Sequence, residues 1–181
     1  MIFLDTLGAV VDDPALLGAE AKPEGLGRTG MLGYFAGALG LFVFLRMYSA
    51  VPPGFFSFGV VFLLLLALEF FVAGTIHLFM ELTGASGRAG RLFQAFGLTD
   101  FLMTALVPAG FLAKAGVLGP FLWYTLCALL LIYARVRLVR RLYPVSANKA
   151  SLSVLLPYAG LFVFLFLAWV YSVAWLIWLM V

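Results

Sequence analysis

The chain alternates long apolar stretches with short polar segments. A bilayer core of ~30 Å is crossed by roughly 20 residues of α-helix. Five apolar stretches reach or approach this length, at residues 31–48, 55–82, 98–115, 119–139 and 152–181, and segments rich in Pro, Gly, Ser or Asn separate them. The pattern predicts an all-α fold, a polytopic membrane helix bundle in which residues 31–181 form one domain of five transmembrane helices.

The first 30 residues differ from the rest, and we expect them to form a cytoplasmic amino-terminal segment. Apolar residues recur there at helical spacing with polar residues between them: Phe3, Leu4, Leu7, Val10 and Val11. This stretch is too short to cross a bilayer, so it predicts a short amphipathic helix at the membrane interface. Residues 88–97 show a similar mixture and suggest a second interfacial element.

Composition excludes most classes of soluble protein. The 181 residues are 65% hydrophobic and 10% charged, whereas soluble domains are nearer half apolar and a quarter charged. The single cysteine, Cys127, permits no disulfide framework within the chain. The sequence has no glycine-rich phosphate loop, nucleophile elbow or HExxH motif, and no basic patch interleaved with aromatic residues. We therefore expect no enzymatic activity, cofactor or metal, and no nucleic-acid partner.

Basic residues are distributed unevenly between the two sides of the predicted bundle. Nine fall on the side of the amino terminus, Lys22, Arg28, Arg88, Arg91, Arg135, Arg137, Arg140, Arg141 and Lys149, and two fall on the other side, Arg46 and Lys114. Short cytoplasmic loops carry an excess of Lys and Arg. The distribution predicts a cytoplasmic amino terminus and a carboxyl terminus on the far side.

Four ionisable residues in or near the spans are candidates for a functional site. Glu69 lies near the middle of the second span, where a charge costs ~2.5–3.5 kcal/mol, and His77 and Glu81 follow on the same face. Glu69 could lock helices together, belong to a proton, ion or substrate pathway, or contact another protein. Asp100, at the start of the third span, could approach His77 and Glu81, or it could cap a helix.

Two further patterns indicate contacts. Four arginines, Arg135, Arg137, Arg140 and Arg141, form the densest charge cluster, which is typical of a topology signal touching lipid headgroups or, alternatively, of a site for an acidic partner. Gly33, Gly37 and Gly40 form a small-residue stripe on the first span. Such a stripe lets another helix approach closely, and the partner helix could belong to this chain or to a second one.

Several short motifs, taken together, resemble a known family. They are Asp13-Pro14-Ala15 after the amphipathic stretch, His77-Leu78-Phe79, Gly84-Ala85-Ser86-Gly87, and residues 91–98 leading into a span with Pro108. The pattern resembles the bacterial branch of the Yip-one family, relatives of the Ypt/Rab-interacting membrane proteins. The resemblance implies five spans, a cytoplasmic amino terminus, the bacterial inner (cytoplasmic) membrane, and action through partners or lipids.

These observations lead to two functional hypotheses. The first is a non-enzymatic membrane adaptor or accessory subunit, whose partners are membrane lipids and other membrane subunits or further copies of itself. The alternative is a small transporter or a proton- or ion-conducting protein that uses Glu69, His77 and Glu81. An intramembrane enzyme would require polar groups from other spans to converge on His77.

Overall fold

The computed structural model describes residues 25–180, and every regular element in that range is a helix. Five helical segments are long and apolar enough to cross a membrane: α2 (Leu26–Met47), α3 (Phe55–Leu82), a composite third segment (Ala89–Lys114), α6 (Pro120–Leu142) and α7 (Ala147–Met180). The prediction of five spans in an all-helical membrane protein is confirmed. The predicted amino-terminal interfacial helix lies outside the described residues.

The third span is built from three consecutive pieces. α4 (Ala89–Asp100) passes into a 3-10 helix, η2 (Phe101–Ala105), and then into α5 (Leu106–Lys114). Pro108 lies in the first turn of α5; it has no N–H to donate, and its ring crowds the carbonyl four residues earlier. The backbone before it tightens to 3-10 geometry, and the Thr104 hydroxyl donates to the Phe101 carbonyl at 2.8 Å.

The span begins nine residues earlier than the predicted start at residue 98, because Arg91 and Gln94 lower the hydropathy of a segment that is nevertheless helical. That segment packs inside the bundle, with Leu92, Ala95 and Phe96 fully buried. The expectation of a surface element at residues 88–97 is therefore wrong. Other boundaries shift less: the first helix starts at Leu26 instead of 31, the fourth ends at Leu142 instead of 139, and the last starts at Ala147 instead of 152.

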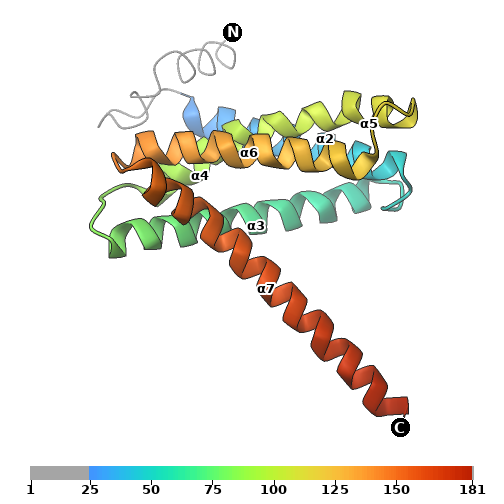
Figure 1. The fold of residues 1–181 in the computed structure, drawn as a ribbon. Coiled ribbons are helices and arrows are strands. Elements are labelled where there is room, and N and C mark those ends of the chain that lie inside the picture. Colours follow the sequence, from blue (N-terminus) through green and yellow to red (C-terminus); the bar gives the residue numbers. More distant parts are fainter. Residues whose placement is uncertain (1–24, 181) are drawn as a thin grey trace.

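Helices α2 to α6 run side by side, while α7 departs obliquely from them (Figure 1). Tight turns reverse the chain between the bundle helices. Gly84 and Gly116 each end a helix with a positive φ, 81° and 80°, which glycine adopts without steric cost. The N–H groups that follow them close the helix ends, from Ala85 to the Met80 carbonyl at 2.9 Å and from Val117 to the Leu112 carbonyl at 3.1 Å.

The glycine stripe of the first span lies directly against the third span. Gly33 faces the carbonyl of Gly97, and Gly37 faces that of Asp100. A Cβ atom at Gly40 would lie 2.7 Å from the Met103 carbonyl oxygen. Because a side chain would collide with backbone at each position, the stripe is what permits α2 to approach α4 and η2. The partner helix of the stripe, left open by the sequence, is within this chain.

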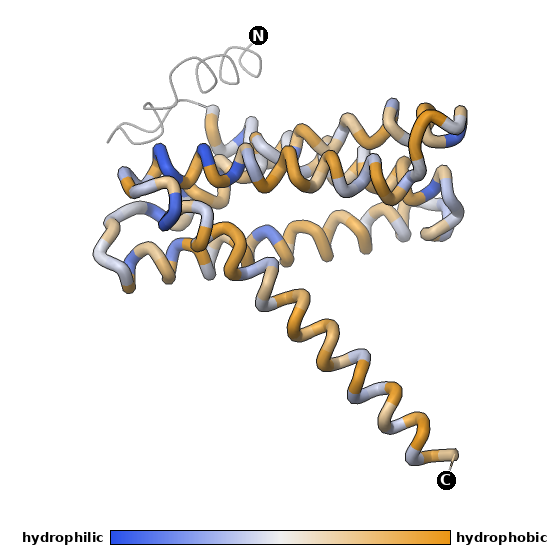
Figure 2. The backbone as a smooth tube through the Cα atoms, in the orientation of Figure 1, coloured by the Kyte–Doolittle hydropathy of each residue, from blue (hydrophilic) through white to orange (hydrophobic). Residues whose placement is uncertain are grey.

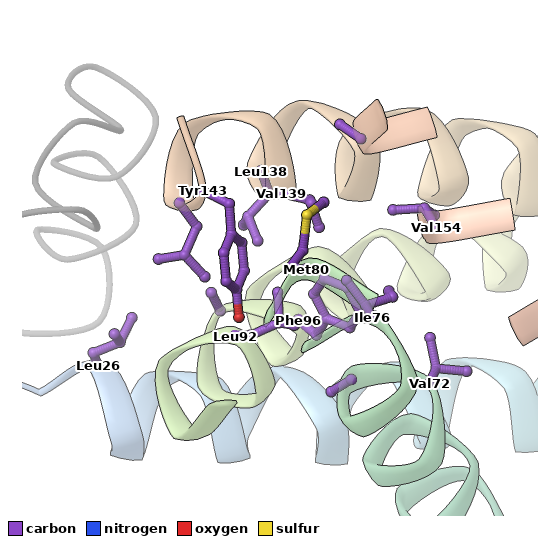
Figure 3. Packing of buried hydrophobic residues seen from close by; sticks show 14 of the residues in the cluster. Leu26, Val72, Ile76, Met80, Leu92, Phe96, Leu138, Val139, Tyr143 and Val154 are labelled. Atoms are coloured by element: carbon purple, nitrogen blue, oxygen red, sulfur yellow. The ribbon is translucent and has the colours of Figure 1, made fainter. Parts of the chain in front are cut away.

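The main apolar core lies toward one end of the bundle, where five helices meet (Figure 3). Its fully buried side chains come from α2, α3, α4, α6 and α7. They include Leu26, Ile76, Met80, Leu92, Phe96, Val139 and Val154. A smaller cluster of Phe44, Met103, Leu106 and Leu131 continues the packing toward the other end. Only the main core includes residues of α7, and these come from its first turns, Ala150 and Val154.

Beyond Tyr158, α7 has almost no contact with the rest of the described chain. None of the side chains in its most apolar 18-residue window is buried, against 56% for the third span. The helix remains apolar as it leaves the bundle (Figure 2). Its 34 residues give a length of ~51 Å at 1.5 Å per residue. A helix longer than the hydrocarbon thickness fits by tilting, which agrees with its oblique course.

Candidate functional site

Arg135, on α6, is the centre of a buried polar cluster and is fully inaccessible to solvent. It occupies the inward face of the helix, the face that also carries Leu131, Leu138, Val139 and Leu142, all of which are buried. These residues lie three, four or seven positions from Arg135, which is the spacing of one helix face. The local sequence therefore directs this arginine into the bundle.

Groups from three other helices surround the Arg135 guanidinium. Its Nη2 lies 2.7 Å from Glu69 Oε2 on α3 and pairs with Asp100 Oδ1 at the end of α4. Nη1 donates to the Tyr158 hydroxyl on α7, and Nε donates to Thr99 Oγ1 at 3.3 Å. The Phe96 ring lies under the guanidinium, 4.7 Å from its carbon, in cation–π geometry. A single side chain thus links α3, α4, α6 and α7.

Both carboxylates lie deep within the bundle. Glu69 is ~20 Å from either end of α3 at 1.5 Å per residue, and it is 3% exposed, while Asp100 is 1% exposed. Charges in such surroundings attract each other much more strongly than in water. Removing one partner of a buried pair leaves an uncompensated charge, so the cluster constrains how the four helices pack.

The cluster contains more negative than positive groups. Two carboxyl groups face one guanidinium, and the structure records no other ion pair to either carboxyl among residues 25–180. Asp100 Oδ2 is buried without a hydrogen-bond partner. Glu69 Oε2 also has no hydrogen bond among these residues, although it lies at ion-pair distance from Arg135. The polar groups are therefore not fully satisfied by residues 25–180.

His77 and Glu81 belong to a separate polar group nearer the end of the bundle. His77 Nε2 lies 3.3 Å from Glu81 Oε1, and Nδ1 lies 2.8 Å from the Tyr143 hydroxyl. Tyr143 follows the last residue of α6, and burial, together with the Glu81 charge, raises the pKa of its phenol to about 12. The hydroxyl therefore stays protonated at neutral pH and can donate to the His77 imidazole.

Of the four ionisable candidates, Glu69 and Asp100 come together, but not with the other two. Asp100 pairs with Arg135, so the sequence-based alternative in which it approaches His77 and Glu81 is wrong. Its other alternative, a helix cap, holds for its position only: Asp100 stands at the N-cap of η2, but its side chain makes no capping hydrogen bond there and pairs with Arg135 instead. No group of three or more His, Cys, Asp or Glu side chains able to hold a metal occurs in the described part of the chain.

The structure divides the four arginines of α6. The expectation that Arg135 contacts lipid or an acidic partner is wrong, since its side chain is enclosed by Glu69, Asp100 and Tyr158. Arg137, Arg140 and Arg141 line a cavity of about 280 Å³ near the end of the helix. Arg137 also lies 5.5 Å above the Tyr133 ring. These three keep a position suited to contact with anionic groups.

Comparison with family models, with curated proteins and with solved structures finds no match to this chain. The geometry of the described residues therefore carries the functional argument.

Proposed function

We propose that this protein is a non-enzymatic integral membrane adaptor or accessory subunit, acting through protein or lipid partners. The observation that carries the proposal is α7, an apolar helix that projects from the bundle and, beyond its first turns, buries almost nothing against the described part of the chain. Beyond its first turns, a membrane helix of this kind offers its surface to lipids or to helices of another subunit.

An aromatic stripe makes one face of α7 suited to a partner helix. Phe162, Phe166 and Trp169 recur at spacings of four and three residues, so they share a face. All three are more than half exposed, and the rings of Phe166 and Trp169 contact each other at 6.4 Å between centroids. Association of membrane helices depends on van der Waals packing, and large rigid rings supply much contact surface.

The polar cluster supports a structural role more than a catalytic or transport role. Arg135 pairs with both Glu69 and Asp100, and all three side chains are almost inaccessible. His77 contacts both Glu81 and Tyr143, and this group lies ~12 Å or more along α3 from Glu69. The alternative function, conduction through Glu69, His77 and Glu81, has support in the excess negative charge of the cluster, but its three residues fall into two separate groups.

The proposed orientation places the amino terminus in the cytoplasm and the carboxyl terminus outside. Among the described residues, one end of the bundle carries the basic residues Arg28, Arg88, Arg137, Arg140, Arg141 and Lys149. Arg46 and Lys114, at the ends of α2 and α5, fall at the other end. The positive-inside rule assigns the more basic end to the cytoplasm. This agrees with the resemblance to the Yip-one family and with residence in a bacterial inner membrane.

Purification in mild detergent tests the proposal. The wild-type chain is expected to elute with another membrane subunit or as an oligomer, and Phe162→Leu with Trp169→Leu should reduce that association while preserving membrane insertion. Phe70→Leu is the matched control, because Phe70 is 70% exposed on α3. Recovery of the wild type only as a lone monomer contradicts the proposal. A proton or ion flux in liposomes that disappears in Glu69→Gln supports the alternative.

A further inference from the structure

The buried cluster has an unbalanced formal charge. Glu69 and Asp100 contribute two negative charges when ionised, and Arg135 contributes one positive charge, leaving one net negative charge near the middle of the bundle. An unpaired charge in hydrocarbon is costly, and two carboxylates that share a site oppose each other's ionisation. The cluster is therefore incomplete without one more positive charge.

Within residues 25–180, the other groups around the cluster do not supply that charge. From α2, Tyr34 is fully buried near both carboxyls and donates its hydroxyl to the Phe93 carbonyl at 2.6 Å. From α7, Tyr158 contributes a phenol, which is neutral in its protonated form. η2 and α5 carry no titratable residue before Lys114, at the far end of α5. Arg91, also on α4, lies nine residues and ~13 Å from Asp100.

An unsatisfied atom indicates which ligand completes the cluster. Among residues 25–180, Asp100 Oδ2 is enclosed and has no hydrogen-bond partner, and Glu69 Oε2 has only the ion-pair contact with Arg135. A protonated carboxyl has an O–H to donate, which a carboxylate lacks. One proton would remove the net charge and give the cluster a further donor. The full burial of both side chains leaves little room for a larger, hydrated cation.

We propose that Glu69 and Asp100 together form a proton-binding site that holds one proton at neutral pH, opposite the single guanidinium of Arg135. The proton belongs to the pair, as in other coupled carboxyl groups. In each single substitution, Glu69→Gln or Asp100→Asn, a neutral amide takes the place of the protonated carboxyl group of the pair. In either variant the remaining carboxyl group is ionised and forms a one-to-one pair with Arg135.

Infrared spectroscopy of the full-length protein in lipid tests this proposal. The wild type at neutral pH should show the C=O band of a protonated carboxylic acid, and the band should be lost in Glu69→Gln and equally in Asp100→Asn. Glu81→Gln is the control and should keep the band, because Glu81 pairs with His77. Absence of the band in the wild type overturns the proposal, and so does a band that survives both cluster substitutions.

A stability measurement gives an independent readout. Unfolded carboxyl groups are ionised above a pH of ~5, so the folded state would bind one more proton than the unfolded state. The folding equilibrium constant should then fall by up to tenfold for each unit of rising pH, and Glu69→Gln should lack this component. An equal dependence in both proteins contradicts the proposal. A wild-type stability that responds to Na⁺ or K⁺ at fixed pH would assign the missing charge to a cation instead.

Discussion

The Arg135 guanidinium, on α6, donates a hydrogen bond to the Tyr158 hydroxyl on α7. Tyr158 lies where α7 leaves the bundle, so this contact joins the charge cluster to the helix that we propose binds partners. Behind it, only the first turns of α7 are buried, at Ala150, Ser153, Val154 and Pro157. The cluster therefore contributes to the angle at which α7 departs.

Replacing Tyr158 with Phe tests this link. The change removes one hydrogen bond to a charged group, and we expect the free energy of unfolding to fall by ~1.5–3 kcal/mol, measured by thermal unfolding in detergent. Spin labels on α3 and α7 should report a broader distance distribution. Tyr171→Phe is the control, because Tyr171 is 71% exposed on the same helix. If Tyr158→Phe and Tyr171→Phe have the same stability and the same distance distribution, the contact between Arg135 and Tyr158 does not hold α7 in place.

The glycine stripe gives a second prediction. Gly33→Ala places a methyl group against the Gly97 carbonyl, so we expect a loss of ~1–3 kcal/mol from overpacking. Gly74→Ala has open space around it and should cause no loss, since alanine favours helix more than glycine. The measurement is the thermal unfolding midpoint of both variants. A Gly33→Ala protein as stable as Gly74→Ala would contradict the close approach of α2 to α4.

The raised pKa of the Tyr143 phenol predicts that the stability of the protein changes at alkaline pH. Its phenol has a pKa of about 12 in the folded protein against the ordinary 10, so the folded state keeps this proton when the unfolded state releases it. The contribution is complete below a pH of ~10 and is lost as the pH rises toward 12. Unfolding of wild type and Tyr143→Phe across this range should show the extra slope only in the wild type. Parallel curves would exclude this contribution.

Membrane topology can be checked with single cysteines in a Cys127→Ala background. The α2 to α3 turn contains exposed Ala50, and the α3 to α4 turn contains exposed Ser86. With the amino terminus in the cytoplasm, a membrane-impermeant thiol reagent added to intact cells should label Ala50→Cys and spare Ser86→Cys. The reverse labelling pattern would invert the proposed orientation.

Much of the architecture follows from local patterns, because a helix that crosses hydrocarbon requires a continuous apolar stretch. The five spans and the close-packing stripe of Gly33, Gly37 and Gly40 were predictable on this basis. Glu69 was recognisable as a buried polar residue from its depth in the second span. These features depend on residues close together in the sequence.

The partners within the cluster could not be predicted in the same way. Arg135 is the first of four arginines on α6, and this run suggested a headgroup contact for all four. The spacing of Arg135 from Leu131, Leu138 and Leu142, however, places it on the inward face of the helix. Tyr158 and Thr99 carried no signal of their own. Arg135 is separated from Asp100 by 35 positions and from Tyr158 by 23, and such contacts depend on how whole helices pack.

The most direct test of the account is whether Glu69, Asp100 and Arg135 act as one charge-balanced unit. We expect either single isostere, Glu69→Gln or Asp100→Asn, to stay near wild-type stability in detergent unfolding. The double variant leaves Arg135 charged and unpaired, at a cost of ~3–5 kcal/mol, and adding Arg135→Met should recover much of that loss. If the three substitutions instead have independent, additive effects, so that the triple variant is less stable than the double variant, the account is contradicted.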